Sequence, residues 1–544
     1  MLQQNPEIQR RLAAIDAAMR RNDVATAGRM AAEAIRLGCD IPQILVLAAI
    51  DALNRGDPLA ALPLAEKARS LLKRDPEVLN VYGSALSALG RDREALAVFD
   101  SALRLAPDRP SLHYNRGCSL DALGYNNHAT RAFEQAVALQ PNHAAAQGRL
   151  AYIAIMRGDV AEARRYGEMA RRYAPDEPSA LMALTLAETE EKHFDTALGH
   201  AQRLLQTCPP GGVNFAIAQS LAGDALDGMK RPAEAFAAYS AHNATMRARY
   251  RAEYERPDLT GACQEAENLA AYFATAPAQQ WRADPATAVA HPPVKTHVFL
   301  VGFPRSGTTL LEQVLDAHPD VETMPERECL EEMAAEFVLK DGGLDRLATL
   351  NDTELAHWRK RYWDRAAEQG STADRPVFID KLPLHSVLLC LVAKLFPDAK
   401  ILFARRDPVD VVWSCFRRRF GMNRQMYELT SLSGAAQYYD AVMRLSELYR
   451  AKLGLATYDT VYEKLVADFE GETREICGFL GIDWREELKS FARTSRRNAP
   501  DTPSGLQVAR GLYSSAVGQW GAYSKELAPI LPTLQPWRAR FGYE

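Results

Sequence analysis

The sequence predicts a helical-repeat solenoid followed by an α/β domain with a parallel sheet. Alanine recurs every 34 residues through the first half of the chain, a period typical of stacked helical pairs. In the second half, the apolar residues 298–301 lead into a loop with two glycines and then into a helical pattern. Residues 377–416 contain two further strand–helix units in succession, and such units build a parallel sheet.

Small residues, turn glycines and prolines share this repeat. The aligned positions are Ala27, Ala61, Ala95, Ala129, Ala163 and Ala197, then Gly56, Gly90, Gly124 and Gly158, and Pro107, Pro141, Pro175 and Pro209. They resemble the tetratricopeptide repeat, in which each unit is a pair of antiparallel helices and small residues allow close helix contact. We expect about seven pairs over residues 1–255, ending in a long charged helix from Pro232 to about Glu255.

The repeat domain offers no chemistry of its own. His113, His128 and His143 are isolated histidines, so no metal site is expected there. A solenoid has a concave surface that suits a peptide or protein partner, but it can equally form a homodimer or support a neighbouring domain. The sequence leaves these alternatives open. Residues 256–294 follow as an expected linker, with one short helical stretch and several prolines.

Composition limits the classes of partner and compartment. The charged fraction of 25% and the formal net charge of −4 give no reason to expect nucleic-acid binding. The N-terminus lacks the layout of a signal peptide, and no apolar run approaches the length of a membrane span, so we expect a cytoplasmic protein. The eight cysteines are scattered without a CxxC pair, which predicts neither a disulfide framework nor a zinc site.

The loop after residues 298–301 is built to hold an anion. Gly302 and Gly307 take the glycine positions of a nucleotide P-loop and Thr309 the hydroxyl position, but Thr308 stands where the lysine should be. That lysine normally reaches the outer phosphates of a triphosphate. The loop therefore suits an anion close to a helix N-terminus, with Arg305 supplying the charge.

The segment PRSGTT followed by LDAHPDV resembles the 5′-phosphosulfate loop of sulfotransferases, and it is most similar to the protein-tyrosine sulfotransferase branch. The family uses 3′-phosphoadenosine 5′-phosphosulfate (PAPS) and releases adenosine 3′,5′-bisphosphate (PAP). The resemblance implies a P-loop-like α/β sulfotransferase domain over residues 295–544. It also implies that the cofactor is bound by Arg305, Ser306, Gly307, Thr308 and Thr309.

The resemblance assigns two catalytic side chains besides Arg305. Tyrosine sulfotransferases carry an acidic residue at the same distance from the loop as Glu326, which implies that Glu326 accepts the proton of the acceptor hydroxyl. The alternative is a solvated acid, since Glu328 and Glu331 lie nearby. The lysine matching Lys381 contacts the transferred sulfate in the family. Lys381 and Arg305 would then neutralise the reacting oxygens without a metal.

A second anion site is expected at the next strand–helix unit. The pattern predicts strands over 377–380 and 400–405 and helices over 384–396 and 408–416, with Asp407 as the cap of the last helix. Arg406 then lies at the carboxyl end of a strand, where open α/β sheets bind ligands. In the family an Arg-x(7)-Ser pair holds the 3′-phosphate, and Arg406 with Ser414 has that spacing.

The remaining candidates lie nearer the C-terminus. A strand ending in Tyr462-Glu463, before a helix from about Lys464, resembles a family segment in which the tyrosine contacts the 3′-phosphate. Ser504 and Arg510 lie in a stretch that resembles the closing cofactor loop, although Gly511 stands where many relatives carry proline.

Arg417, Arg418 and Arg419, together with Arg424, form a basic cluster after the second anion site. Such a run is either a solvated face or a rim of the cleft that favours an acidic acceptor.

Together these features predict a PAPS-dependent sulfotransferase that transfers a sulfuryl group to a hydroxyl. The acceptor is a peptide tyrosine recruited by the repeats or, as the alternative, a sugar, lipid or small-molecule alcohol. A P-loop kinase or NTPase and an inactive adaptor are the competing classes. A triphosphate enzyme would need the lysine that Thr308 replaces and would have no use for the pair of Arg406 and Ser414.

Overall fold

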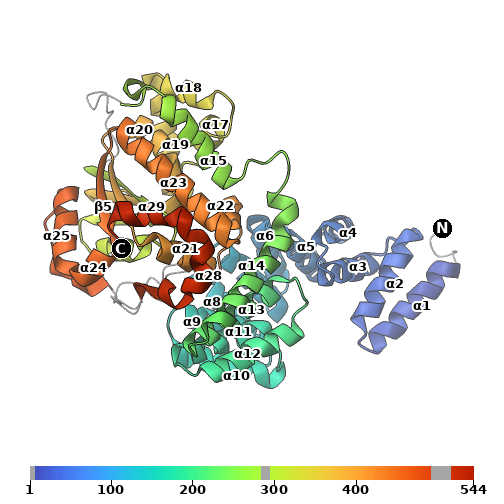
Figure 1. Cartoon of the computed structure of the whole chain (residues 1–544). Helices are drawn as coiled ribbons and strands as arrows, with labels where there is room; N and C mark the ends of the chain where they lie inside the picture. The colour runs from blue at the N-terminus through green and yellow to red at the C-terminus, as the bar shows by residue number, and fades with distance from the viewer. Residues whose placement is uncertain (1–5, 283–293, 492–515, 544) are drawn as a thin grey trace. The chain divides into compact units, whose positions relative to one another are not determined.

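The computed structural model describes residues 6–282, 294–491 and 516–543. The chain divides into two compact units, Met1–Ile155 with Asp159–Ala187, and Met156–Gly158 with Glu188–Glu544. Figure 1 follows the helices from α1 in blue to the last helices in red. The second unit begins well before the expected domain boundary at residue 255, so the last repeats pack as part of the α/β unit.

The first unit is a series of paired helices. They are α1 (Pro6–Arg20), α2 (Val24–Arg36), α3 (Pro42–Asn54), α4 (Pro58–Leu71), α5 (Pro76–Ala88), α6 (Asp92–Leu105), α7 (Pro110–Ala122), α8 (Asn126–Leu139), α9 (Ala144–Met156) and α10 (Val160–Tyr173), followed by α11 (Pro178–Glu190), which runs into the second unit. Many of these helices begin with proline at the first turn, where its missing N–H costs no hydrogen bond.

The repeated small residues lie where the helices touch. Every alanine of the 34-residue series from Ala27 to Ala163 has no exposed surface. A Cβ atom added at Gly83 would come within 2.6 Å of the Phe99 ring, and one added at Gly117 would meet Phe133 at the same distance. The sequence repeat is therefore a packing repeat, because larger side chains would push the paired helices apart.

The second unit continues the helical pairs before its sheet begins. Its first helices are α12 (Phe194–Thr207), α13 (Val213–Gly228), α14 (Pro232–Tyr254) and α15 (Ala262–Thr275). The long helix α14 matches the predicted terminal helix. Helix α15 matches the helical stretch expected within the linker, and it packs into the core, with the Phe273 ring 4.9 Å from Tyr449. Its buried apolar face makes this part of the chain a structural element.

The sheet of the second unit has five parallel strands. They are β1 (Thr296–Gly302), β2 (Val321–Pro325), β3 (Val377–Lys381), β4 (Lys400–Arg405) and β5 (Ala456–Val461), in the order β2-β3-β1-β4-β5. Alternate residues of β1 point to opposite faces, so that Val298 and Val301 belong to different apolar clusters. Both faces are covered, as expected for a parallel sheet.

Helices surround this sheet. They are α16 (Thr308–Asp316), α17 (Glu331–Phe337), α18 (Gly343–Ala348), α19 (Asp352–Glu368), α20 (Leu389–Leu395), α21 (Pro408–Phe416), α22 (Arg424–Glu428), α23 (Leu432–Lys452), α24 (Tyr462–Ala467), α25 (Phe469–Leu480), α28 (Ser524–Leu527) and α29 (Leu531–Phe541). Short 3₁₀ turns are η2 (Ala278–Gln280), η4 (Pro383–Leu388), η5 (Glu486–Ser490), η7 (Gln519–Tyr523) and η8 (Ala528–Ile530).

Two predicted element boundaries differ from the structure. The helix expected over 384–396 begins as the 3₁₀ turn η4, in which the Ser386 hydroxyl donates to the Gly302 carbonyl and ties the turn to β1. Strand β5 ends at Val461, and Tyr462 already begins α24. The predicted strand over 400–405 and helix over 408–416 match β4 and α21.

Candidate active site

The candidate site residues gather at the carboxyl edge of the sheet. Because the strands are parallel, their C-terminal residues Gly302, Pro325, Lys381, Arg405 and Val461 lie along one edge. The strands β1 and β4 are neighbours, with Gly302 opposite Ala404. Segments that are far apart in the sequence thus place the anion loop beside the second predicted anion site.

The anion loop has a strained backbone. Arg305 and Gly307 both have positive φ angles, of 72° and 99°. A Cβ atom at Gly307 would approach the Tyr462 ring to 2.8 Å, so only glycine fits there. Gly307 caps the N-terminus of α16, and Thr308 and Thr309 form the first helical turn. The free N–H groups of that turn make an anion site.

The second anion site adjoins this loop directly. Arg406 donates from Nη1 to the Arg305 carbonyl at 3.4 Å, and Arg305 donates from Nε to the Ser414 hydroxyl at 3.0 Å. The Arg406 guanidinium lies 5.0 Å from the centre of the Tyr462 ring. Its Nε is buried without a hydrogen-bond partner in the described part of the chain. A buried, incompletely bonded arginine is suited to a phosphate oxygen.

Other residues fix Arg406 in place. Its Nη2 lies 3.6 Å from Asp410 Oδ2 and donates to the Ala516 carbonyl. Asp410 also accepts the backbone N–H of Gly518 at 2.6 Å. Asp407 caps α21 as predicted, by accepting the Val409 N–H at 2.8 Å. The arginine is therefore positioned by the start of its own helix and by the segment that follows residue 515.

Lys381 is held between two carboxylates. Its Nζ lies 2.6 Å from Glu326 Oε1 and 3.1 Å from Glu312 Oε2. Glu326 has a positive φ of 42°, and its N–H donates to the Lys381 carbonyl at 2.7 Å. The structure thus brings Glu326, the predicted proton acceptor, into contact with Lys381. The backbone bond holds Glu326 at the carboxyl edge of the sheet.

Glu312 was missed by the sequence reasoning. It is completely buried on α16, and burial raises its pKa to about 7 despite the opposing effect of Lys381. The signal was present in the sequence as a single acid within the apolar pattern TTLLEQVL. An acid on the apolar face of a helix requires a partner, and here the partner is Lys381.

A second missed group surrounds Asp380. This buried carboxylate accepts from the Tyr362 hydroxyl at 2.7 Å and lies 3.6 Å from His385 Nδ1. Burial raises the pKa of Asp380 to about 7 and lowers that of His385 to about 3. His385 is therefore a neutral imidazole in the pH range in which enzymes usually work.

A cavity of about 820 Å³ is lined by residues of the anion loop together with Glu326, His385, Arg406 and Tyr462. We call one part of its lining the anion wall, formed by Arg305, Gly307, Thr308, Thr309, Arg406 and Tyr462. We call another part the mixed wall, formed by Glu326, Glu328, Glu331, Ala334, Ala335, Leu339, Leu384, His385, Phe420, Arg424 and Met426. The volume is in the range of small-molecule binding sites.

Several sequence predictions lie outside this cavity. Ser306, Lys381 and Ser414 are buried and are not among the residues that line it. Ser504 and Arg510 lie outside the described residues. Arg424 of the predicted basic cluster lines the cavity. The run Arg417–Arg419 does not, because Arg419 pairs with Asp224 of α13 at 2.8 Å and Arg417 with Asp227 at 3.4 Å. These arginines join the last repeat to the α/β core.

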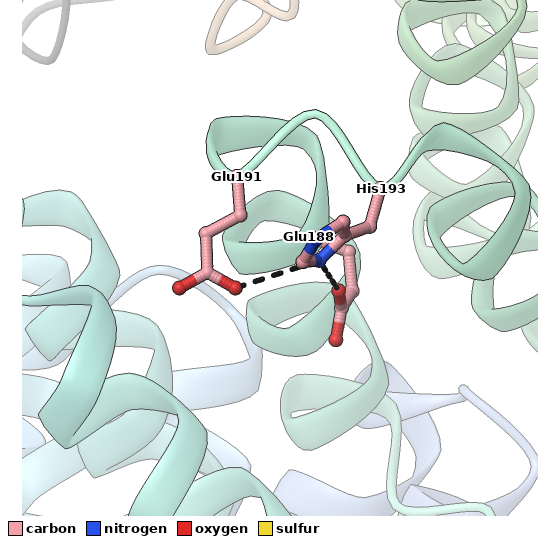
Figure 2. A group of neighbouring side chains, drawn as sticks. All are labelled: Glu188, Glu191 and His193. Carbon is pink, nitrogen blue, oxygen red and sulfur yellow. Dashed lines mark hydrogen bonds and ion pairs between the residues drawn. The ribbon is translucent and has the colours of Figure 1, made fainter.

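Figure 2 shows two carboxylates and a histidine at the turn between α11 and α12, none of which lines the cavity. His193 Nδ1 lies 3.0 Å from Glu188 Oε2 and 3.6 Å from Glu191 Oε2. These three side chains satisfy the spacing of metal ligands within the described part of the chain. The histidine already contacts both carboxylates, so the geometry is that of a local ion pair.

The α/β part of the chain matches a known protein family. The model of the sulfotransferase family matches residues 297–486. This span contains the anion loop, Glu326, Lys381, Arg406, Ser414 and Tyr462. Residues 297–486 form a sulfotransferase-family domain. The tetratricopeptide repeat model matches residues 76–109 and 110–143, so the chain combines this domain with tetratricopeptide repeats.

The relatives of the sulfotransferase domain are distant. An uncharacterized protein of Aquifex aeolicus is 28% identical over 256 residues, which cover 45% of this chain and 33% of that protein. Protein-tyrosine sulfotransferase A of Caenorhabditis elegans is 25% identical, over 45% of this chain and 67% of its own length. The protein-tyrosine sulfotransferase of Drosophila melanogaster is 26% identical, over 44% and 50%. The chain therefore spans one third to about two thirds of these relatives.

Among solved structures, the sulfotransferase domain of the Synechococcus PCC 7002 olefin synthase is 25% identical with a TM-score of 0.32. The match covers 43% of this chain and 90% of that domain. Within the described residues, no helix combines the length and the apolar character that a membrane crossing requires.

Proposed function

We propose that the protein is a PAPS-dependent sulfotransferase that transfers a sulfuryl group to a hydroxyl acceptor. The observation that carries this proposal is the direct contact between the two anion sites, in which Arg406 bonds the Arg305 carbonyl and Arg305 bonds Ser414. A nucleotide with phosphates on both its 3′ and 5′ oxygens needs two such sites on one edge.

The anion wall would bind the donor. The first turn of α16 and Arg305 take the 5′-phosphosulfate, since helix N–H groups and a guanidinium both favour an anion. Arg406, Ser414 and Tyr462 take the 3′-phosphate. Thr308 supports this donor over a nucleoside triphosphate, because the loop lacks the lysine that reaches outer phosphates.

Transfer would proceed by in-line displacement at sulfur. The acceptor oxygen forms a bond to sulfur as the bond from sulfur to the 5′-phosphate oxygen breaks, and PAP leaves. The hydroxyl proton passes to the carboxylate of Glu326. Lys381 stabilises negative charge on the transferred group and the leaving phosphate. The contact of Lys381 with Glu326 at 2.6 Å supports this pairing of a proton acceptor with a cation.

The ion pair between Lys381 and Glu326 does not prevent Glu326 from acting as the base. A carboxylate is a weak base towards an alcohol, but proton transfer that accompanies bond formation depends more on position than on basicity. The positive φ of Glu326 and its backbone bond to Lys381 supply that position.

The proposal for the acceptor is less specific than the proposal for the donor. Several relatives are named protein-tyrosine sulfotransferases, which supports a peptide tyrosine delivered by the repeats. Sugars, lipids and small-molecule alcohols present the same reacting hydroxyl. The repeats would recruit a partner or form a homodimer. An isolated repeat fragment separates these uses. Self-association of the fragment would support a homodimer, whereas capture of a peptide would support recruitment.

Replacement of Glu326 by Gln tests the proposed reaction. We expect PAPS turnover to fall by at least about a hundredfold, because the proton acceptor is lost, while calorimetric affinity for PAP stays within about threefold. Mass spectrometry of treated cell extract would identify the sulfated product. Glu332→Gln is the matched control, because Glu332 pairs with Arg361 outside the cavity lining. Lost PAP affinity in Glu326→Gln would instead make this residue structural.

A further inference from the structure

The mixed wall of the cavity combines carboxylates with an apolar surface. Its apolar members are Ala334, Ala335, Leu339, Leu384, Phe420 and Met426. Glu328 and Glu331 lie on the same wall, at the start of the segment that forms α17. Neither carboxylate forms an ion pair within the described ranges. Glu326, the proposed proton acceptor, lines the same wall.

The positive charge on the mixed wall is already paired with a carboxylate. Among the described residues of the mixed wall, Arg424 is the positively charged side chain, and it pairs with Glu265 of α15. It also donates to the Thr260 carbonyl at 3.0 Å. The other lining arginines, Arg305 and Arg406, belong to the anion wall that the donor occupies. An anionic acceptor would therefore meet carboxylates and find no available cation on this wall.

The two carboxylates act on each other and on their surroundings. Burial and the like charge of Glu331 raise the pKa of Glu328. Glu328 in turn contributes to the raised pKa of Asp380, the neighbour of His385. The wall thus carries an excess of negative charge that a cation would relieve.

His385 adds an unused polar group to the same wall. Its side chain is almost fully buried, with 1% of the residue exposed, and it lines the cavity. Neither ring nitrogen has a hydrogen-bond partner within the described structure. A buried imidazole left unbonded costs free energy, which a polar group of a ligand would recover.

We infer that the acceptor is a hydroxyl compound with an apolar body and a positive charge, such as a phenol or alcohol that carries an amine. Glu328 and Glu331 receive the cation, the apolar residues of the mixed wall contact the body, and His385 bonds a polar group. This inference rests on the proposed sulfuryl transfer. It disfavours the acidic peptide that the basic run of Arg417–Arg419 suggested, since those arginines do not line the cavity.

Three phenols of similar size test the charge preference. Tyramine is cationic, 4-ethylphenol is neutral and 3-(4-hydroxyphenyl)propionate is anionic. We expect kcat/KM with PAPS to favour tyramine over the propionate by at least about tenfold at low salt. In Glu328→Gln/Glu331→Gln this ratio should fall to within about threefold. The control Glu332→Gln/Glu336→Gln, which changes an exposed and a half-buried acid of α17 outside the lining, should keep it.

Calorimetric binding of the three phenols to the PAP-loaded and the free protein tests the charge preference of the wall separately from the proposed sulfuryl transfer. Binding that favours tyramine without any PAPS turnover would support the charged wall while overturning the proposed reaction. Preference for the propionate, equal binding of all three, no binding, or a ratio unchanged in Glu328→Gln/Glu331→Gln would overturn the inference.

Discussion

At the scale of single residues, the site depends on charges that are buried together. Lys381 and Glu312 have no exposed side-chain surface, and Glu326 is one third exposed. Burial of such groups is costly unless each has a partner, so the three residues depend on one another. Glu326 of this group and Arg305 of the anion loop are among the non-glycine residues with positive φ, so part of the backbone strain lies at the proposed site.

Glu312 predicts a pH dependence of stability. Its pKa rises from the model-compound value of 4.5 to about 7 in the folded protein, so folding binds this proton more tightly. The stabilising contribution is complete below about pH 4.5 and is lost as the pH rises through 7. Denaturant unfolding of the wild type and of Glu312→Gln measures it. The advantage of wild type over variant should be smaller at pH 8 than at pH 5.

An equal difference between these two proteins at pH 5 and pH 8 would contradict this account of Glu312. Asp345→Asn is a useful reference, because Asp345 is an exposed acid that bonds the Tyr272 hydroxyl away from the cavity lining.

Ser414 predicts a selective loss of nucleotide affinity. Its hydroxyl accepts from Arg305 and is proposed to bond the 3′-phosphate. Ser414→Ala should weaken PAP binding by about tenfold, the usual effect of losing a hydrogen bond to a charged group. Affinity for AMP, which has no 3′-phosphate, should change by less than about twofold. A parallel loss of both affinities in calorimetry would show that the serine only supports the loop.

At the scale of elements, the site is built from one loop and the ends of neighbouring strands. Residue types and spacing were enough to predict β4, α21 and the cap at Asp407, because each of these has a local signal. The 3₁₀ start of η4 was not predicted, since it follows from a contact between Ser386 and Gly302 that joins distant segments. Glu312 and His385 were missed for the same reason, as their partners come from other elements.

Gly307 offers a test of the loop. Gly307→Ala places a Cβ at a positive φ and within 2.8 Å of the Tyr462 ring. We expect about 1 kcal/mol of destabilisation from the backbone and a loss of PAP affinity of at least about tenfold from displaced Tyr462. Gly342→Ala is a matched control, because Gly342 also caps a helix with positive φ but has no atom within 4 Å of the added Cβ.

Calorimetry and denaturant unfolding distinguish the two glycines. Both variants should lose stability, whereas only Gly307→Ala should lose PAP binding. If both retained PAP affinity, the close approach of Tyr462 to the loop would have no role in the site.

At the scale of the whole molecule, the second unit includes the last helices of the repeat. The sequence predicted the repeat period, the parallel sheet and the order of the two parts. It placed their boundary at residue 255, because periodicity marks where a repeat ends but not where a core begins. The core extends further back, since Phe236 of α14 stacks on Trp413 with ring centres 6.0 Å apart and Asn243 donates to the Phe416 carbonyl at 2.6 Å.

Fragments of the chain test this boundary. A fragment of residues 188–544 should unfold cooperatively in denaturant, because it retains α12–α15 against the core. A fragment of residues 295–544 should aggregate or unfold without a cooperative transition, since it exposes Trp413 and Phe416, which are almost fully buried in the chain. Cooperative unfolding of the shorter fragment with the same midpoint would show that the repeat helices add nothing to its stability.

The most direct measurement of the central claim is calorimetric binding of PAP and of ATP to the wild-type protein at the same salt concentration. The two adjoining anion sites predict that PAP binds at least about a hundredfold more tightly, because only PAP presents a 3′-phosphate to Arg406 and Ser414. Equal affinity, or tighter binding of ATP, would contradict the assignment of these sites to a nucleotide phosphorylated at both its 3′ and 5′ positions.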